Sequence, residues 1–379
     1  MSMESRSTPK RIIPYGRHCL DHDDMKSVGK TLSSDWLTQG PVGVKFEERL
    51  AKYCGARYAL TASSGTSALH LAYLSAGIGK GDEVITTPNT FVATTNMLLV
   101  VGAKPVFCDI RLDTYNIDET KIEALITKKT KAIVPVHFAG HPCNMKEIMA
   151  IAKKYHLLVI EDACHALGAT YRGKHVGSIG DITVFSFHPV KSITTGEGGA
   201  IVTGNKKYAE KARLLRSHGI TKDKNGFNVM ESLGFNYRLT DIQSSLGVSQ
   251  LGKLKGFITK RRKTAFLYRK LLERNQDIIL PAEEGEDQFA WHLFVIRVRN
   301  VKERLPLYHF LKNNGIGVNF HYPTVYSHPY YRKNGYDTVH LMNADLYNEA
   351  AITLPIFPSI SEKDVIFITD SIKKYFKAR

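Results

Sequence analysis

The stretch DITVFSFHPVKSITTGEGGAIVTGN, residues 181–205, decides the fold because it holds two apolar runs on either side of a glycine-rich segment. Both runs are rich in β-branched residues and predict two strands joined by a turn. Lys191 closes the first strand and enters the turn, where glycines let the backbone pass close to a ligand. A lysine held in a cleft at this place can form a Schiff base with a carbonyl compound. The alternative is an exposed loop lysine without a chemical role.

Residues 57–205 alternate between strand-like and helix-like segments. Short apolar runs predict strands at 83–86, 105–107, 132–136 and 157–160. Helices are predicted at 66–76, 145–154 and 208–216, and the apolar residues of 145–154 follow the i, i+3, i+4, i+7 spacing. This alternation is typical of an α/β domain with a mainly parallel sheet. We expect the strand pair in 181–205 to join that sheet as well. Its two strands are connected by a turn, whereas helices connect the other predicted strands.

The pattern changes after residue 205. Thr240 and Gln243 fit a capping box that predicts a helix through Gln250, and a long basic helix is expected over 253–274. The remaining elements are expected to be a strand at 291–299, a helix at 305–313, a strand at 316–321 and a last helix capped by Ser361. We therefore expect a large domain over 1–255 and a smaller α+β C-terminal domain over 256–379, with residues 1–40 packing near the smaller domain.

The composition is that of an ordinary globular protein, with 43% hydrophobic and 23% charged residues among 379. No apolar run reaches the roughly 18 residues that a membrane span needs. The start, MSMESRSTPKR, lacks the apolar core of a secretory signal, so we expect a cytoplasmic protein. Five scattered cysteines without a CxxC pair predict neither a disulfide framework nor a metal site.

The formal net charge of +16 is high. The basic residues are dispersed, with clusters only at 253–263 and at the C-terminus, and neither cluster lies in a helix-turn-helix or zinc-finger pattern. A solvated basic face, or a positive field that attracts an anionic diphosphate substrate, is therefore expected rather than binding of nucleic acid.

Asp162 lies in the segment VIEDACHA, residues 159–166, at the carboxyl end of a predicted parallel strand. Ligands of α/β sheets bind at such strand ends. Pyridoxal phosphate (PLP) chemistry needs a carboxylate opposite the pyridine nitrogen, because a protonated ring is a better electron sink. The alternative is that Asp162 caps a helix. Cys164 is discounted as a thiol nucleophile because it and its neighbour His165 are expected to point apart.

The small-residue loop TASSGTSAL, residues 61–69, runs directly into a predicted helix. Free backbone N–H groups and the helix dipole at such a place can hold a phosphate. The loop has no Gly-Lys-Ser/Thr and is therefore not a Walker A loop. The alternative is a simple capping turn.

Together these segments resemble the sugar-nucleotide aminotransferases of the DegT type, a family with the aspartate-aminotransferase fold (PLP-dependent fold type I). The resemblance covers nearly the whole chain from Leu37 onward. The motifs that carry it are SSGTSAL (63–69), TTPNTFVATTN (86–96), VIEDACHALGA (159–169), FSFHPVKSITTGEGG (185–199), GFNYRLTDIQSSLG (234–247) and NFHYP (319–323).

The resemblance implies PLP as the cofactor, bound by the large domain. Lys191 would form the Schiff base with it and move protons to and from the substrate carbon. Asp162 would pair with the ring nitrogen, His165 would bond to the phenolic oxygen, and Phe91 would stack on the ring. A lysine at position 191 also favours transamination, because family members that dehydrate or deoxygenate the sugar carry a histidine there.

The resemblance further implies how the phosphate and the sugar are held. Gly65, Thr66 and Ser186 would bind the phosphate. Asn236 would reach the phosphate of the neighbouring subunit, which implies a homodimer with shared active sites. His321 and Tyr322 are candidates for the sugar-nucleotide pocket.

The expected reaction moves an amino group from L-glutamate to C4 of a nucleotide-linked 4-keto-6-deoxy sugar. The stretches at 37–48, 114–118, 216–223 and 235–251 are most similar to the C4 aminotransferases of pseudaminic acid synthesis, which act on UDP-2-acetamido-2,6-dideoxy-L-arabino-hex-4-ulose. In contrast, AWHLFVIRV (290–298) is more similar to the enzymes that make UDP-4-amino-4-deoxy-L-arabinose. Perosamine-type enzymes share the same motifs, and a non-catalytic regulator or nucleic-acid binder on this fold is the distant alternative.

Overall fold

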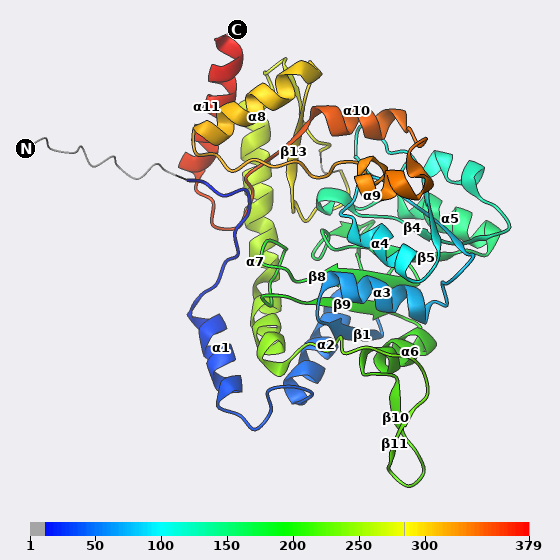
Figure 1. Cartoon of the computed structure of the whole chain (residues 1–379). Coiled ribbons are helices and arrows are strands. Elements are labelled where there is room, and N and C mark those ends of the chain that lie inside the picture. Colours follow the sequence, from blue (N-terminus) through cyan, green and yellow to red (C-terminus); the bar gives the residue numbers. More distant parts are fainter. Residues whose placement is uncertain (1–11, 284, 379) are drawn as a thin grey trace, which may run out of the picture.

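A seven-stranded sheet forms the centre of the larger part of the computed structural model, which describes residues 12–283 and 285–378 (Figure 1). The strand order is β1-β9-β8-β5-β4-β2-β3. Neighbours from β8 to β3 are parallel, whereas β9 is antiparallel to both β8 and β1. The strands are β1 Tyr58–Ala62, β2 Glu83–Thr86, β3 Lys104–Phe107, β4 Thr130–Val134, β5 Leu158–Asp162, β8 Ile182–Ser186 and β9 Gly199–Thr203. The mainly parallel α/β sheet expected from the sequence is confirmed.

Helices cover both faces of this sheet. Alternate residues of one strand point to opposite faces, so Ile201 of β9 packs with the cluster under α3 and α6, while Val202 packs with the cluster under α2 and α7. The helix α5 covers the same face as α2 and α7, beside β4 and β5. These helices are α2 Pro41–Cys54, α3 Gly65–Ser75, α4 Ala93–Val100, α5 Met145–Tyr155, α6 Lys206–Arg216 and α7 Asp241–Leu272.

The C-terminal part is built on a smaller antiparallel sheet with the order β12-β13-β14. Its core lies between this sheet, α8, α11 and the last turns of α7. The first described residues pack here too, since Ile13 bridges to Ile316 and the Tyr15 carbonyl accepts from Ile356 N–H. Residues 22–32 pack on the first half of α7 instead. The elements are β12 Ile278–Ile279, β13 Phe294–Val298, α8 Arg304–Asn313, α9 Pro329–Tyr331, α10 Met342–Ala350, β14 Ala351–Leu354 and α11 Glu362–Lys377.

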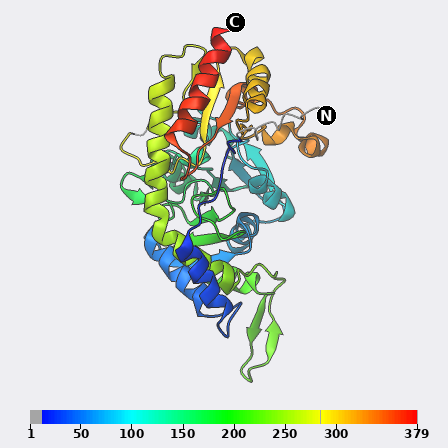
Figure 2. The same cartoon turned by 90° about the vertical axis from the view of Figure 1, so that its left-hand side faces the viewer.

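Two small hairpins and one helix complete the strands and α-helices that the structure describes. The hairpin β10 Ile220–Lys222 and β11 Asn228–Met230 projects from the large part (Figure 2). The second hairpin is β6 Thr170–Tyr171 and β7 Lys174–His175, and α1 His22–Leu32 packs on α7.

Two sequence expectations in the C-terminal half are wrong. The helix to Gln250 and the basic helix 253–274 are one continuous helix, α7, which no proline interrupts. The capping box at Thr240 and Gln243 and the cap at Ser361 are confirmed. The strand at 316–321 does not form, since Ile316 and Asn319 bridge singly to different segments. The predicted domain boundary at 255/256 falls inside α7, and the division into two domains stays a prediction.

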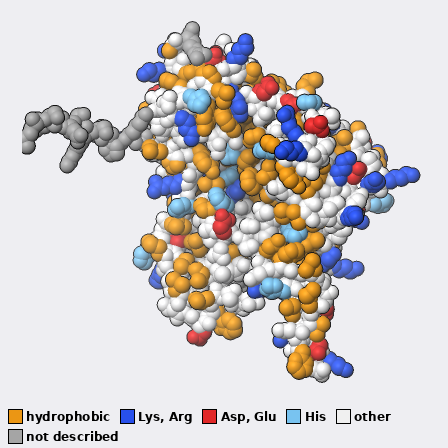
Figure 3. Space-filling view, in the orientation of Figure 1, with side chains coloured by type: hydrophobic (Ala, Val, Ile, Leu, Met, Phe, Trp, Pro, Cys, Tyr) orange, Lys and Arg blue, Asp and Glu red, His pale blue; other side chains and the backbone are white. Residues whose placement is uncertain are grey.

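On the face in Figure 3, lysine and arginine side chains are spread over several elements. In the described part of the chain, no helix combines the length and the apolar character that crossing a membrane requires.

Candidate active site

One cavity of about 510 Å³ gathers nine of the ten site residues that the sequence predicted. It lies where β1, β5 and β8 end, which is the edge of an α/β sheet that binds ligands. The C-terminal part closes it from the other side. The nine residues are Gly65, Thr66, Phe91, Asp162, His165, Ser186, Lys191, His321 and Tyr322.

Lys191 lies in the segment between β8 and β9, and its backbone N–H donates to the His188 carbonyl at 2.9 Å. The segment is folded back on the strand end, because Thr195 N–H donates to the Phe187 carbonyl at 3.0 Å. Burial lowers the pKa of the Lys191 amine, nearby Cys164 and Asp162 act in the opposite direction, and Arg261 lowers it further. The lysine therefore loses its proton more easily than a lysine in water.

Asp162 ends β5 with its carboxylate in the cavity, 5% exposed. Its Oδ2 accepts from Thr94 Oγ1 at 2.7 Å and its Oδ1 from Cys164 N–H at 3.1 Å. Among the residues that the structure describes, no lysine or arginine forms an ion pair with it. A buried carboxylate without a cationic partner is costly, and the protonated ring nitrogen of PLP is a fitting partner.

His165 is fixed by the backbone of the next loop. Its Nδ1 accepts from Ala139 N–H at 3.3 Å, which leaves the proton of the neutral ring on Nε2, 3.1 Å from the Tyr322 hydroxyl. Burial and the neighbouring Lys191 hold the pKa of His165 well below its usual range. The ring is therefore neutral and presents an N–H donor to the cavity.

The start of α3 forms a cradle for an anion. Ser64 and Ser67 cap each other reciprocally, whereas the first N–H groups of the helix, at Gly65 and Thr66, have no intrahelical acceptor. Gly65 is required by space, because a Cβ there would lie 2.9 Å from the Cβ of Ser186. This close approach brings the Ser186 hydroxyl to the helix N-terminus, where a phosphate is favoured.

Phe91 is 56% exposed at the cavity. Its ring lies 5.9 Å from that of Tyr322. An exposed aromatic ring at a cavity is free to cover a flat ligand.

Asn236 is the one predicted site residue outside this cavity. It bridges to Ser217 beside the hairpin β10–β11. Its predicted place in the site of a neighbouring subunit stays a prediction.

The sequence analysis did not identify several other residues that line the cavity. Tyr15 belongs to the N-terminal segment, and His292 precedes β13, with its ring 4.3 Å from that of His165. Thr94 and Asn319 lie inside quoted motifs but carry no signal of their own. His188, three residues before Lys191, also lines the cavity.

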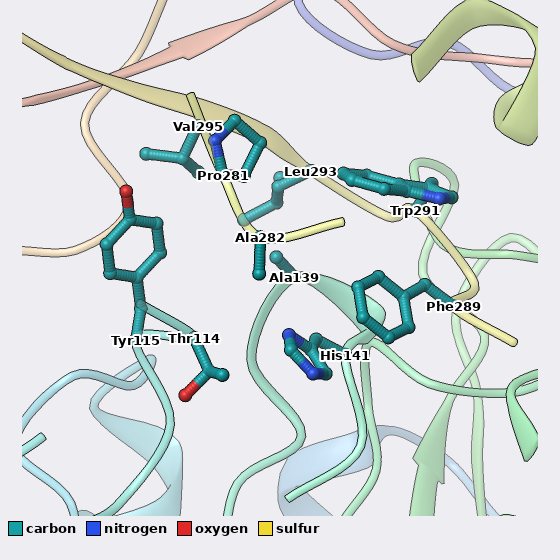
Figure 4. Close-up of a pocket in the computed structure, with 10 residues that line it drawn as sticks. All are labelled: Thr114, Tyr115, Ala139, His141, Pro281, Ala282, Phe289, Trp291, Leu293 and Val295. Carbon is teal, nitrogen blue, oxygen red and sulfur yellow. The ribbon is translucent and has the colours of Figure 1, made fainter. Parts of the chain in front are cut away.

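A second cavity lies behind the Ala139 loop and is lined mostly by apolar side chains (Figure 4). Its volume is about 20 Å³, which is the room of a single water. His141 borders it and stacks on Phe289, with ring centroids 3.8 Å apart. The cavity gathers no set of reactive side chains.

Comparison with known proteins identifies the family. The model of the DegT/DnrJ/EryC1/StrS aminotransferase family matches residues 18–373. The chain is 41% identical over 366 residues to the UDP-4-amino-4,6-dideoxy-N-acetyl-beta-L-altrosamine transaminase of Campylobacter jejuni, covering 95% of this chain and 96% of that protein. It is 39% identical over 379 residues to the spore coat polysaccharide biosynthesis protein SpsC of Bacillus subtilis, covering 97% of each.

A solved structure agrees with this result. Helicobacter pylori PseC, an aminotransferase of pseudaminic acid biosynthesis, superposes with a TM-score of 0.94 at 37% identity, covering 97% of this chain and all of that one. The predicted fold type and family are thereby confirmed. The chain belongs to the DegT/DnrJ/EryC1/StrS aminotransferase family and is a sugar aminotransferase that depends on pyridoxal phosphate.

Proposed function

We propose that this protein transfers the amino group of L-glutamate to C4 of UDP-2-acetamido-2,6-dideoxy-L-arabino-hex-4-ulose, a nucleotide-linked 4-keto-6-deoxy sugar. The observation that carries the proposal is a lysine, Lys191, with a lowered amine pKa in a cavity that also holds Asp162 and His165. The near full-length likeness to the Campylobacter jejuni transaminase and to PseC supports the choice of sugar.

The cavity residues fit PLP by charge and shape. Asp162 would hold the ring nitrogen, His165 the phenolic oxygen, and Gly65, Thr66 and Ser186 the phosphate. Phe91 would cover the ring. When bound, the cofactor supplies an electron sink that stabilises the negative charge left when a proton leaves the substrate carbon.

Lys191 would act as general base and general acid. In its neutral form Nζ can accept the proton from the amino-acid carbon in the first half-reaction, and in its protonated form it can donate a proton to sugar C4 in the second. Burial lowers the pKa of the amine and so raises the share of the neutral form. The Asp162 carboxylate limits that effect, so that the ammonium form needed for the second step can still form.

The sugar nucleotide would enter from the side of the C-terminal part. His321 and Tyr322 line the cavity there, and burial lowers the pKa of His321 to about 4. Its Nδ1 pairs with Thr353 Oγ1 at 2.9 Å. A neutral His321 held in this way can offer a hydrogen bond to a sugar or phosphate oxygen.

The proposal includes a homodimer in which Asn236 completes the site of the other subunit. Exposed apolar side chains on and beside the hairpin β10–β11 support an interface at this place. They are Phe227, Val229, Met230 and Leu233, with exposed fractions of 69%, 42%, 66% and 75%.

Borohydride reduction tests the site. We expect PLP-loaded protein to be yellow and reduction to fix the cofactor to the peptide that contains Lys191. The Lys191→Ala variant should bind PLP without a reducible link. Labelling of another lysine in the wild-type protein would contradict the assignment.

The sugar is tested with L-glutamate and a panel of 4-keto nucleotide sugars, with products read by mass spectrometry. We expect turnover of the UDP-N-acetyl substrate above that of the 4-keto precursors of UDP-4-amino-4-deoxy-L-arabinose and of perosamine. Turnover of either precursor, with none of the UDP-N-acetyl sugar, would refute the proposed substrate.

A further inference from the structure

Arg261, in the middle of α7, is 1% exposed, and its guanidinium binds the backbone carbonyl of the residue before Lys191. Burial lowers its pKa to about 10, so the guanidinium stays protonated at neutral pH. Within the described part of the chain, no carboxylate forms an ion pair with it, and its Nε has no hydrogen-bond partner. A buried charge without a counter-ion costs several kcal/mol, and such a cost calls for a compensating role.

The partners of Arg261 are backbone carbonyls from three segments. Its Nη2 donates to the Val190 carbonyl at 3.3 Å, next to Lys191. Its Nη1 donates to the carbonyls of Trp291 and His292, each at 3.3 Å, and of Ile356 at 3.0 Å.

Two of these segments carry a cavity residue, and the third holds one through a backbone hydrogen bond. Lys191 follows Val190, and His292 lines the cavity itself. Ile356 N–H holds the Tyr15 carbonyl at 3.1 Å, and Tyr15 also lines the cavity. One side chain therefore joins the lysine segment to two segments of the C-terminal part.

The charged and titratable groups around Lys191 come from all sides of the cavity. Asp162, Cys164 and His165 come from the end of β5, His188 and Glu197 from the lysine's own segment, His292 and His321 from the C-terminal part, and Arg261 from α7. Burial lowers the pKa of each of these four histidines, so the rings are neutral. Among these groups, Arg261 is the permanent cation.

We propose that Arg261 is a positioning residue for Lys191, which clamps the Val190–Lys191 segment to the C-terminal part and places a fixed positive charge on the buried side of the lysine. The inference rests on the role proposed above for Lys191. The charge opposes protonation of the amine, and the clamp keeps the amine aimed into the cavity. Arg261 touches neither cofactor nor substrate in this role.

Three variants of Arg261 separate the charge from the hydrogen bonds. Arg261→Lys keeps the charge, Arg261→Gln keeps a neutral donor, and Arg261→Met removes both. The matched control is Arg297→Met in β13. Arg297 is 7% exposed and is likewise bound through neutral oxygens, to the Tyr115 hydroxyl at 3.2 Å and the Leu112 carbonyl at 3.3 Å.

The first readout is the reactivity of Lys191 with acetic anhydride in cofactor-free protein, followed against pH by mass spectrometry of its peptide. We expect the midpoint to rise by about one pH unit in Arg261→Gln and Arg261→Met, which means roughly tenfold less neutral amine below the midpoint. Arg261→Lys and Arg297→Met should stay near the wild-type midpoint. The second readout is the pH dependence of the visible absorption of PLP-loaded protein. Its midpoint should shift in Arg261→Gln and Arg261→Met and stay near the wild-type value in Arg261→Lys and Arg297→Met.

The outcomes are distinct. If Arg261→Gln folds and its Lys191 midpoint equals that of Arg261→Lys, the charge has no role and the inference fails. If Arg297→Met shifts the midpoint as much as Arg261→Met, the shift reflects loss of packing, and the inference fails again. If Arg261→Met does not fold, the pair Arg261→Lys and Arg261→Gln decides alone. Borohydride attachment to a lysine other than 191 would instead overturn the proposed function.

Discussion

At the residue scale, the orientation of Asp162 depends on a threonine that is distant in sequence. Thr94 lies 68 positions earlier and donates to the carboxylate from α4 at 2.7 Å. Thr94 also accepts at its carbonyl from the hydroxyl of Tyr73, which is buried. The Thr94 hydroxyl therefore keeps the Asp162 carboxylate oriented toward the place where a ring nitrogen would lie. The Ala139 N–H fixes the ring of His165 in the same way.

We expect Thr94→Val to weaken PLP binding about fivefold, since a hydrogen bond to a charged group contributes about 1.5 kcal/mol or somewhat more, part of which remains through the Cys164 N–H. Titration of cofactor-free protein with PLP, followed by absorbance, measures the change. Thr95→Val is the matched control. Thr95 is equally buried but pairs with the Tyr331 hydroxyl at 2.6 Å, so it should lower stability and leave PLP affinity intact. Equal effects of both variants on affinity would speak against a special role of Thr94.

Gly65→Ala should disrupt the phosphate cradle. The added Cβ would meet the Ser186 Cβ at 2.9 Å and its Oγ at 3.2 Å, and overpacking of this kind costs about 1–3 kcal/mol. We expect a loss of PLP affinity of about tenfold or more, with pyridoxal, which lacks the phosphate, affected less. Gly204→Ala has open space around its Cβ and should bind both as the wild type does. Unchanged affinity in Gly65→Ala would place the phosphate elsewhere.

At the element scale, α7 joins the two parts of the chain, running from the large sheet to the C-terminal part (Figure 2). The basic cluster at 253–263 predicts a solvated face or a positive field, but Arg261 within it is buried, because the C-terminal part packs over that side of the helix. Helical periodicity alone does not reveal which charged position of a long helix will be covered. That information comes from the segments at 291–292 and 356, which lie 30 or more positions away.

The same helix offers a stability prediction. Gly252 lies in its interior with nothing within 4 Å of an added Cβ, and glycine costs about 0.8–1 kcal/mol relative to alanine in a helix. Gly252→Ala should therefore raise the free energy of unfolding by somewhat less than 1 kcal/mol in denaturant titration. Gly247→Ala is the opposite case, because its Cβ would lie 2.6 Å from the Phe46 ring, and it should destabilise. If Gly252→Ala destabilises the protein as Gly247→Ala does, then position 252 does not have the free space around an added Cβ that the structure shows.

Elements were predictable where the signal is local. A few neighbouring residues are enough to predict these elements. They are the apolar runs of β2, β4, β5, β8 and β9, the capping box of α7 and the polar residues at the strand ends. The segment 316–321 looks strand-like, yet its edge is divided between Ile13 and Thr353, so no ladder forms. Tyr15 and His292 line the cavity only because the C-terminal part packs against the large part. No local sequence pattern predicts that packing, so these two residues could not be predicted.

At the scale of the whole molecule, buried and half-buried histidines lie between the two parts. His321 is 7% exposed at the main cavity, and His141 stacks on Phe289 at the smaller one (Figure 4). Burial lowers the pKa of each to about 4 from a usual value of 6.5. Both rings are therefore neutral in the folded protein at pH values where they are already charged in the unfolded chain.

This difference makes the folded protein sensitive to acid. Below pH 6.5 the unfolded chain binds a proton at His141 that the folded chain does not bind until about pH 4, so stability is lost as the pH falls through this window. The full shift corresponds to about 3 kcal/mol for one histidine. His141→Phe keeps the stacking on Phe289 and removes the proton site. We expect it to narrow the difference in unfolding free energy between pH 7 and pH 4.5 by about 2–3 kcal/mol, measured by denaturant titration of cofactor-free protein. His309→Phe, at an exposed position on α8, is the control and should leave that difference as it is. If the unfolding free energy of His141→Phe falls between pH 7 and pH 4.5 as much as that of the wild type, the acid sensitivity arises from other groups.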